Sequence, residues 1–222
     1  MQKCQKVLRE ILPSLFKDES ETVLSAIADV LTRLTAGEQV RIHEVRALDD
    51  GVDALLLMDE WRLVQPVGNS MTKAWEDVSQ LIASRDDVGL TLPPWVKTLI
   101  QLACNTKILS VRKAILTLFS DEGHPAWLKM PQFLFEMAGS SEHGVIDSVK
   151  INRLLREIPL GISADTLIAQ LKNYGFISPH LRADFFRMQS PHYEIHPMIL
   201  YTAAHGKGEP GNAEDENPLH DL

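Results

Sequence analysis

Apolar residues recur at helical spacing through most of the chain, and short polar or glycine-containing stretches separate the runs. The spacing predicts a helix over 3–12 that Pro13 ends. A capping box of Asp18 and Glu21 predicts the start of a second helix, and Gly37 predicts its end. The amino-terminal region is therefore expected to be helical.

The pattern from residue 42 to residue 119 alternates helices with turns and extended pieces. It predicts these elements in order: a helix over 42–48, a turn at 49–51, a helix over 52–60, an extended piece over 61–67, and a helix over 71–83. After Pro93-Pro94 one long helical segment runs to Phe119. This segment is apolar over much of its circumference, so we expect it to bridge two modules or to pack against a second chain.

The stretch from residue 155 to residue 180 changes character twice. Two short helical runs are separated by a turn at 160–163. The second run, over 164–174, stops at Gly175 and gives way to the extended pair Phe176-Ile177. The order is helix, tight turn, helix and strand.

The same order occurs earlier, when the chain is shifted by 113 positions. Residues 42–45 then fall on 155–158, and residues 54–64 fall on 167–177. Each copy has a short helix, a turn, a second helix and an extended apolar pair. An ungapped match of this length indicates an internal repeat.

The second copy resembles the winged helix-turn-helix superfamily. Residues 151–178 look like helix 2, the turn, the recognition helix and the first wing strand. Residues 192–199 look like the returning strand, with 179–191 between them as the wing. The first copy is similar but departs from the pattern, because Trp61 stands where a glycine is usual and 65–70 leaves room for only a stunted wing.

The resemblance implies a mainly α fold with small β-wings, of the α+β class, in which a helical segment joins two winged helix-turn-helix modules. The expected divisions are a degenerate winged-helix module with an N-terminal helix over 1–90, a helical linker and dimerisation segment over 91–140, a winged-helix module over 141–205 and a disordered acidic tail over 206–222.

Charge is distributed unevenly within a formal net charge of −8. Residues 1–90 carry 10 Lys and Arg against 16 Asp and Glu, whereas 145–205 carry 6 against 5. Because acidic surfaces repel phosphate, the first 90 residues make a poor nucleic-acid interface. Nucleic-acid binding is therefore expected only in the region 145–205.

The helix over 164–174 has two faces by helical spacing. Its apolar residues face inward, and Thr166, Gln170 and Asn173 fall on the opposite face. Gln and Asn pair with adenine in the major groove, and surrounding Lys and Arg suit phosphates. The plainer interpretation is a solvated face. The candidate nucleic-acid-binding residues are Lys150, Arg153, Ser163, Thr166, Gln170, Lys172, Asn173, Arg182 and Arg187.

Catalytic and cofactor motifs give no comparable signal. The sequence at 206–211 fits GxGxxG but follows no strand, and 43–47 lacks the second histidine of HExxH. His192, Glu194 and His196 alternate along a predicted strand, but they spread too widely to close around one metal ion. We expect these three to face water and Tyr193 and Ile195 to face the core. The chain is thus expected to be no enzyme, with no metal and no cofactor.

Cys4 and Cys104 form no CxxC pair, so we expect two reduced thiols. Charges interrupt the apolar positions of the amino terminus, and no apolar run is long enough to span a membrane. These features favour a cytoplasmic protein.

The function expected first is that of a homodimeric DNA-binding transcriptional regulator, which reads the major groove with the helix over 164–174. The alternative is an acidic winged-helix adaptor that makes protein–protein contacts without binding DNA. In either case the first module is free to bind a protein partner.

Overall fold

The computed structural model describes residues 2–68, 74–75, 86–120, 125–180 and 190–205. It is mainly helical with two small antiparallel sheets, as the sequence predicted. The first half contains α1 (Gln2–Leu15), α2 (Glu21–Thr35), β1 (Val40–Arg41), α3 (Ile42–Arg46), α4 (Gly51–Glu60), β2 (Gln65–Pro66) and β3 (Gly89–Thr91). The central helices are α6 (Pro94–Thr106) and α7 (Val111–Ser120). The second half contains the 3₁₀ helix η1 (Pro125–Lys129), α8 (Met130–Gly139), β4 (Val145–Asp147), α9 (Ser148–Glu157), α10 (Ala164–Tyr174), β5 (Ile177–Pro179), β6 (His192–Ile195) and α11 (Pro197–His205).

From α2 to α6 and again from α8 to α11, the described elements follow one order: helix, strand, two helices, two strands, helix. Their sheets have the same topology, with strand orders β1-β3-β2 and β4-β6-β5. The ends of α4 and α10 also match at the 113-residue shift. Leu63 N–H donates to the Met58 carbonyl (2.8 Å), and Phe176 N–H donates to the Leu171 carbonyl (2.9 Å).

A left-handed residue ends both helices. Gly175 has a φ of 84° and Arg62, its equivalent in the first half, has a φ of 53°. The prediction that Trp61 stands at the glycine position is therefore wrong by one residue, because Arg62 holds that position. A left-handed conformation costs a non-glycine residue about 1 kcal/mol. The Arg62 side chain offsets part of this cost, since it pairs with Asp59 at 3.0 Å and lies over the Trp75 ring.

These two left-handed residues also connect the second half to α6 and to the first half. The Trp95 indole N–H donates to the Gly175 carbonyl (3.2 Å), and His196 Nε2 lies 3.1 Å from the Arg62 carbonyl. The Trp95 and His196 rings meet edge to face, with centroids 4.6 Å apart. At the end of each of the two helices, α4 and α10, a ring nitrogen therefore contacts the carbonyl of the left-handed residue.

His196 is fully buried, which corrects the expectation that it faces water. Strand β6 ends at Ile195, so the alternation that the sequence suggested stops before His196. The Met198 N–H donates to Nδ1 (3.2 Å), so Nε2 carries the proton and donates to the Arg62 carbonyl. Burial lowers the pKa of His196 to about 3, and the Arg62 charge acts in the same direction.

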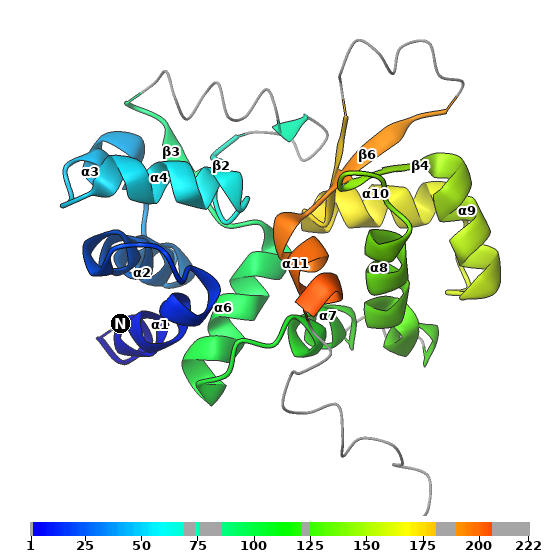
Figure 1. Ribbon diagram of the computed structural model, residues 1–222, viewed down its shortest axis with the longest axis horizontal. Coiled ribbons are helices and arrows are strands. Elements are labelled where there is room, and N and C mark those ends of the chain that lie inside the picture. The colour runs from blue at the N-terminus through cyan, green and yellow to red at the C-terminus, as the bar shows by residue number, and fades with distance from the viewer. Residues whose placement is uncertain (1, 69–73, 76–85, 121–124, 181–189, 206–222) are drawn as a thin grey trace, which may run out of the picture.

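One hydrophobic core runs through both halves and the central helices. Trp95 and Phe176 are fully buried in it, and their rings stack at 5.2 Å. Figure 1 shows α1–α4 (blue to cyan) and α8–α10 (green to yellow) on either side of α6 and α11. The core crosses both predicted boundaries, at 90/91 and at 140/141. The apolar circumference of α6 and α7 is covered within one chain, so it does not require a second copy.

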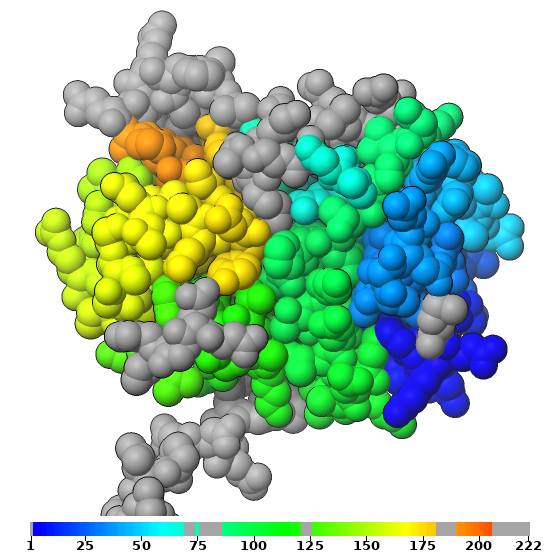
Figure 2. Space-filling model, turned by 180° about the vertical axis from the view of Figure 1, so that it is seen from behind, coloured from blue at the N-terminus to red at the C-terminus, as the bar shows by residue number. Residues whose placement is uncertain are grey.

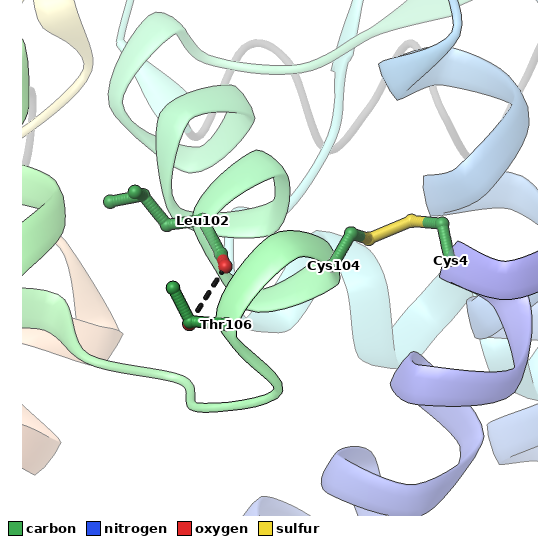
Figure 3. The surroundings of a disulfide bond; sticks show 4 residues. All are labelled: Cys4, Leu102, Cys104 and Thr106. Atoms are coloured by element: carbon green, nitrogen blue, oxygen red, sulfur yellow. Dashed lines mark hydrogen bonds between the residues drawn. A yellow bond between two sulfur atoms is a disulfide. The ribbon is translucent and has the colours of Figure 1, made fainter.

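Cys4 of α1 and Cys104 of α6 form a disulfide, and the prediction of two free thiols is wrong. Figure 3 shows the bond crossing from one helix to the other, with the Cα atoms 4.7 Å apart. On the same turn of α6, Thr106 Oγ1 donates to the Leu102 carbonyl (2.9 Å). The bond fastens the amino-terminal helix to a central helix.

Local predictions were corrected at three other places. The long helix expected up to Phe119 is two helices, because Lys107 takes a left-handed conformation and ends α6. Helix α2 is capped by Ser20, whose side chain accepts from the Val23 N–H, and not by Asp18. Pro13 lies within α1 instead of ending it.

Three predicted segments lie wholly or largely outside the described residues: the helix over 71–83, the middle of the wing over 181–189 and the tail over 206–222. Of the helices that the structure does describe, none is long and apolar enough to cross a membrane.

Candidate nucleic-acid interface

Local sequence signals fix both ends of α10. The Ser163 hydroxyl accepts a hydrogen bond from the Thr166 backbone N–H (3.2 Å), which caps the amino terminus. The Ser163 and Thr166 hydroxyls also bond to each other (2.8 Å). At the other end, the left-handed Gly175 donates its N–H back to α10. Ser163 thus has a structural role, and Thr166 points its side chain toward the cap.

The outer face of α10 is uncovered by the described chain. Thr166 and Asn173 are exposed, as are Asp165 and Ala169, and Lys172 is half-buried. Figure 2 shows this helix (yellow) forming a broad part of the visible face, beside the green of α6. Of the predicted stripe, Thr166 and Asn173 are accessible to a macromolecule.

Gln170 is placed differently from the rest of the stripe. Its amide oxygen is buried, and the described residues give it no hydrogen-bond partner. A two-fold pairing with adenine needs both the oxygen and the nitrogen of the amide. In this conformation Gln170 does not present that pair.

Lys150 forms an ion pair with Glu142 (2.6 Å), and this contact lowers the pKa of the Glu142 carboxyl. Its backbone N–H bonds to the Asp147 carboxylate, which caps α9. Arg153 is exposed, and its Nε lies 3.8 Å from Oε1 of Glu157. Lys150 is therefore already partnered, whereas Arg153 makes only a long surface contact.

Arg182 and Arg187 lie outside the described residues. Arg156, which was not among the predicted residues, is exposed in the last turn of α9, three residues after Arg153. Helical spacing of the two arginines was the signal that could have identified it. Over residues 148–174, which span α9 and α10, 4 Lys and Arg stand against 2 Asp and Glu.

A cavity of about 660 Å³ lies between the two halves, next to β4 and β6. Arg62 lines it from the first half. In the second half, Lys150 pairs with Glu142 and His180 pairs with Glu194 at 2.7 Å. Because cations and carboxylates line it together and bond to one another, its charge favours no class of ligand.

No cluster of three metal-ligating side chains occurs within the described ranges. His192 bonds through Nδ1 to the Ser190 carbonyl (2.8 Å), Glu194 pairs with His180, and His196 is buried at the junction. The three residues that alternate in the sequence, His192, Glu194 and His196, therefore lie in three separate environments.

The first-half counterpart of α10 is α4, and its outer face is different. Val52 and Leu56 are exposed by 52% and 58%. Asp53 and Glu60 are exposed beside them. Over residues 42–60, which span α3 and α4, 1 Arg stands against 6 Asp and Glu. This surface repels phosphate.

A protein-family model matches residues 5–204. The chain belongs to that family. The family has no described function, and its match runs from α1 to α11, so both halves belong to one family unit. Characterised proteins and solved structures give no match.

Proposed function

We propose that each half is a winged helix-turn-helix module and that the second half binds duplex DNA. The support for the fold is the order of elements and the strand orders β1-β3-β2 and β4-β6-β5, in which the third strand of each half lies in the middle. In this assignment α4 and α10 are the recognition helices. Strands β5 and β6 are then the wing strands of the second module.

The observation that carries DNA binding is the outer face of α10, a firmly capped helix whose exposed Thr166 and Asn173 are uncharged. A helix enters the major groove with such a face toward the base edges, and Asn pairs two-fold with adenine. Arg153, Arg156 and Lys172 flank this face as phosphate contacts. Transcriptional regulation is the corresponding role.

Lys150 contributes to this mode only if it exchanges Glu142 for a phosphate. Such an exchange leaves the Glu142 carboxylate near the DNA, so its net gain is small. Gln170 contributes only if its side chain rotates outward. The proposal therefore depends mainly on Asn173 and on the three flanking cations. Lys150 and Gln170 carry less of it than the sequence predicted.

The test uses the full chain and a pool of random duplexes, with fluorescence anisotropy at rising salt. Each phosphate contact adds about −0.9 to the log–log slope of affinity against salt. Asn173→Ala should cost about 1–3 kcal/mol on the selected duplex. Asn105→Ala removes the same amide from an exposed site on α6 and should leave affinity unchanged.

Arg153→Ala should flatten the salt slope and weaken binding to every sequence alike, because phosphate contacts carry no base information. Absence of binding to any duplex at low salt would overturn the proposal.

A second candidate function is a protein adaptor without DNA binding. The Lys150–Glu142 ion pair favours it, because this pair neutralises a cation that a DNA interface would use. The homodimer is retained as a proposal in both cases. Since α6 and α7 are covered within one chain, a dimer would need another surface, and light scattering at micromolar concentration tests it.

A further inference from the structure

The outer face of α4 is apolar in its middle. Val52 and Leu56 lie one helical turn apart, so their side chains are neighbours on the surface. The other side of the helix packs into the core through Ala54, Leu55 and Met58. Within the described chain nothing covers the outer pair, although each of the two is more than half exposed.

Carboxylates surround this pair. Residues 49–60 contain 5 Asp and Glu and no Lys or Arg. Asp59 pairs with Arg62, and Asp50 accepts hydrogen bonds from Ser20 and Thr22. The other three, Asp49, Asp53 and Glu60, are exposed, and the described residues form no ion pair with them.

Charge decides between the possible occupants of this face. In a symmetric dimer the same patch meets itself, so the acids of one copy would oppose the acids of the other. A neutral apolar segment would cover Val52 and Leu56 but leave the carboxylates beside it unpaired. Only a cationic partner satisfies both parts of the face.

We infer that the outer face of α4 docks a basic amphipathic helix of another protein. Two apolar side chains of the partner, three or four residues apart, pack on Val52 and Leu56. Lys and Arg beside them pair with Asp49, Asp53 and Glu60 at the rim. This inference does not rest on DNA binding by α10.

The probes are two synthetic helical peptides: one with leucine at every third or fourth position and lysine between, and one with glutamate replacing each lysine. The full chain is titrated into each labelled peptide. The basic peptide should bind, its affinity should fall with salt, and the acidic peptide should not bind. Val52→Ser with Leu56→Ser should weaken binding by about tenfold or more.

Matched controls separate this face from general attraction to an acidic protein. Leu128→Ser changes a leucine that is 73% exposed on η1 and should leave binding unchanged. Asp53→Asn with Glu60→Gln should weaken binding more than Glu10→Gln with Glu136→Gln, which removes the same charge from α1 and α8.

Failure of the basic peptide to bind at low salt overturns the inference, as does equal loss in the control variants. The same variants are measured on duplex DNA. If α4 variants lose the peptide and keep DNA, the two surfaces act separately. If the chain binds the peptide and no duplex, this inference stands while DNA binding fails.

Discussion

The outer faces of α4 and α10 differ, although the two helices hold the same place in the two halves. Four outward positions correspond at the 113-residue shift: Val52, Asp53, Leu56 and Glu60 correspond to Asp165, Thr166, Ala169 and Asn173. All of them are exposed. The inward positions, by contrast, are apolar and buried in both helices.

The inner faces of α4 and α10 therefore hold the fold together, whereas their outer faces are available to partners. Packing fixes the inner faces, and the junction of Trp95 and His196 holds the halves at one relative position. The outer faces are free of that requirement. One half presents an acidic, partly apolar helix. The other presents a mainly polar helix with one exposed carboxylate, Asp165, beside cations, and this arrangement suits two different partners.

The largest effect is expected from the disulfide, which fastens α1 of the first half to the central helix α6 and has no counterpart in the second half. Replacing Cys4 and Cys104 by serine should destabilise the protein by about 4.7 kcal/mol, because the bond closes a loop with a sequence separation of 100 and the unfolded variant regains that freedom. Urea unfolding of the variant and of the oxidised and reduced wild type measures this change. In hydrogen exchange, α1 should lose protection first. Equal loss in α8 would contradict the view that the bond acts locally.

The next effect concerns His196 and the pH dependence of stability. Its folded pKa of about 3 lies below the ordinary value of 6.5, so between these values the unfolded chain binds a proton that the folded chain does not. Stability from this group is complete above pH 6.5 and falls with decreasing pH, by about 1.4 kcal/mol per unit.

His196→Leu cannot be protonated and should flatten this part of the profile, although it loses the bond to Arg62 and is less stable at neutral pH. The difference between the two unfolding profiles isolates the residue from the carboxylates that both proteins share. Parallel profiles between pH 4 and pH 6.5 would contradict a neutral, buried histidine.

The smallest effect compares the two left-handed helix ends. Gly175→Ala should cost about 1 kcal/mol, since alanine resists a φ of 84°. Gly139→Ala is the control: outside its chain neighbours and the backbone of its own helix, no atom lies within 4 Å of the added Cβ. The residue is helical, so this change should be neutral or stabilising. Thermal melts of both variants make the comparison. A Gly175→Ala protein as stable as the wild type would show that the end of α10 rearranges.

Local signals made part of the fold predictable. Ser163 and Gly175 mark the ends of α10 through hydrogen bonds to residues a few positions away, so the sequence placed this helix correctly. The 113-residue repeat likewise found the equivalent helices in both halves. The short strands β1, β3 and β4 were missed, because two or three residues carry no periodic pattern.

Long-range contacts were not predictable from the chain alone. Nothing near Cys4 or Cys104 indicates that α1 and α6 lie side by side. The pairing of Lys150 with Glu142 was missed because the two lie eight residues apart, across a turn and strand β4, where no helical or strand spacing brings them together. Alternation in residues 192–196 suggested one exposed row, but the end of β6 turns His196 into the junction.

The measurement that tests the central claim most directly is duplex binding by the full chain at rising salt, with matched variants on the two helices. We predict that Asn173→Ala with Arg153→Ala weakens binding and flattens the salt slope. Asp53→Asn with Glu60→Gln should leave the affinity for DNA unchanged or raise it slightly. These carboxylates lie on α4 and not on α10, and their removal only reduces repulsion of phosphate. Equal loss of DNA affinity from both pairs of changes, or no binding by the wild type at low salt, would contradict the claim that α10 binds DNA and α4 does not.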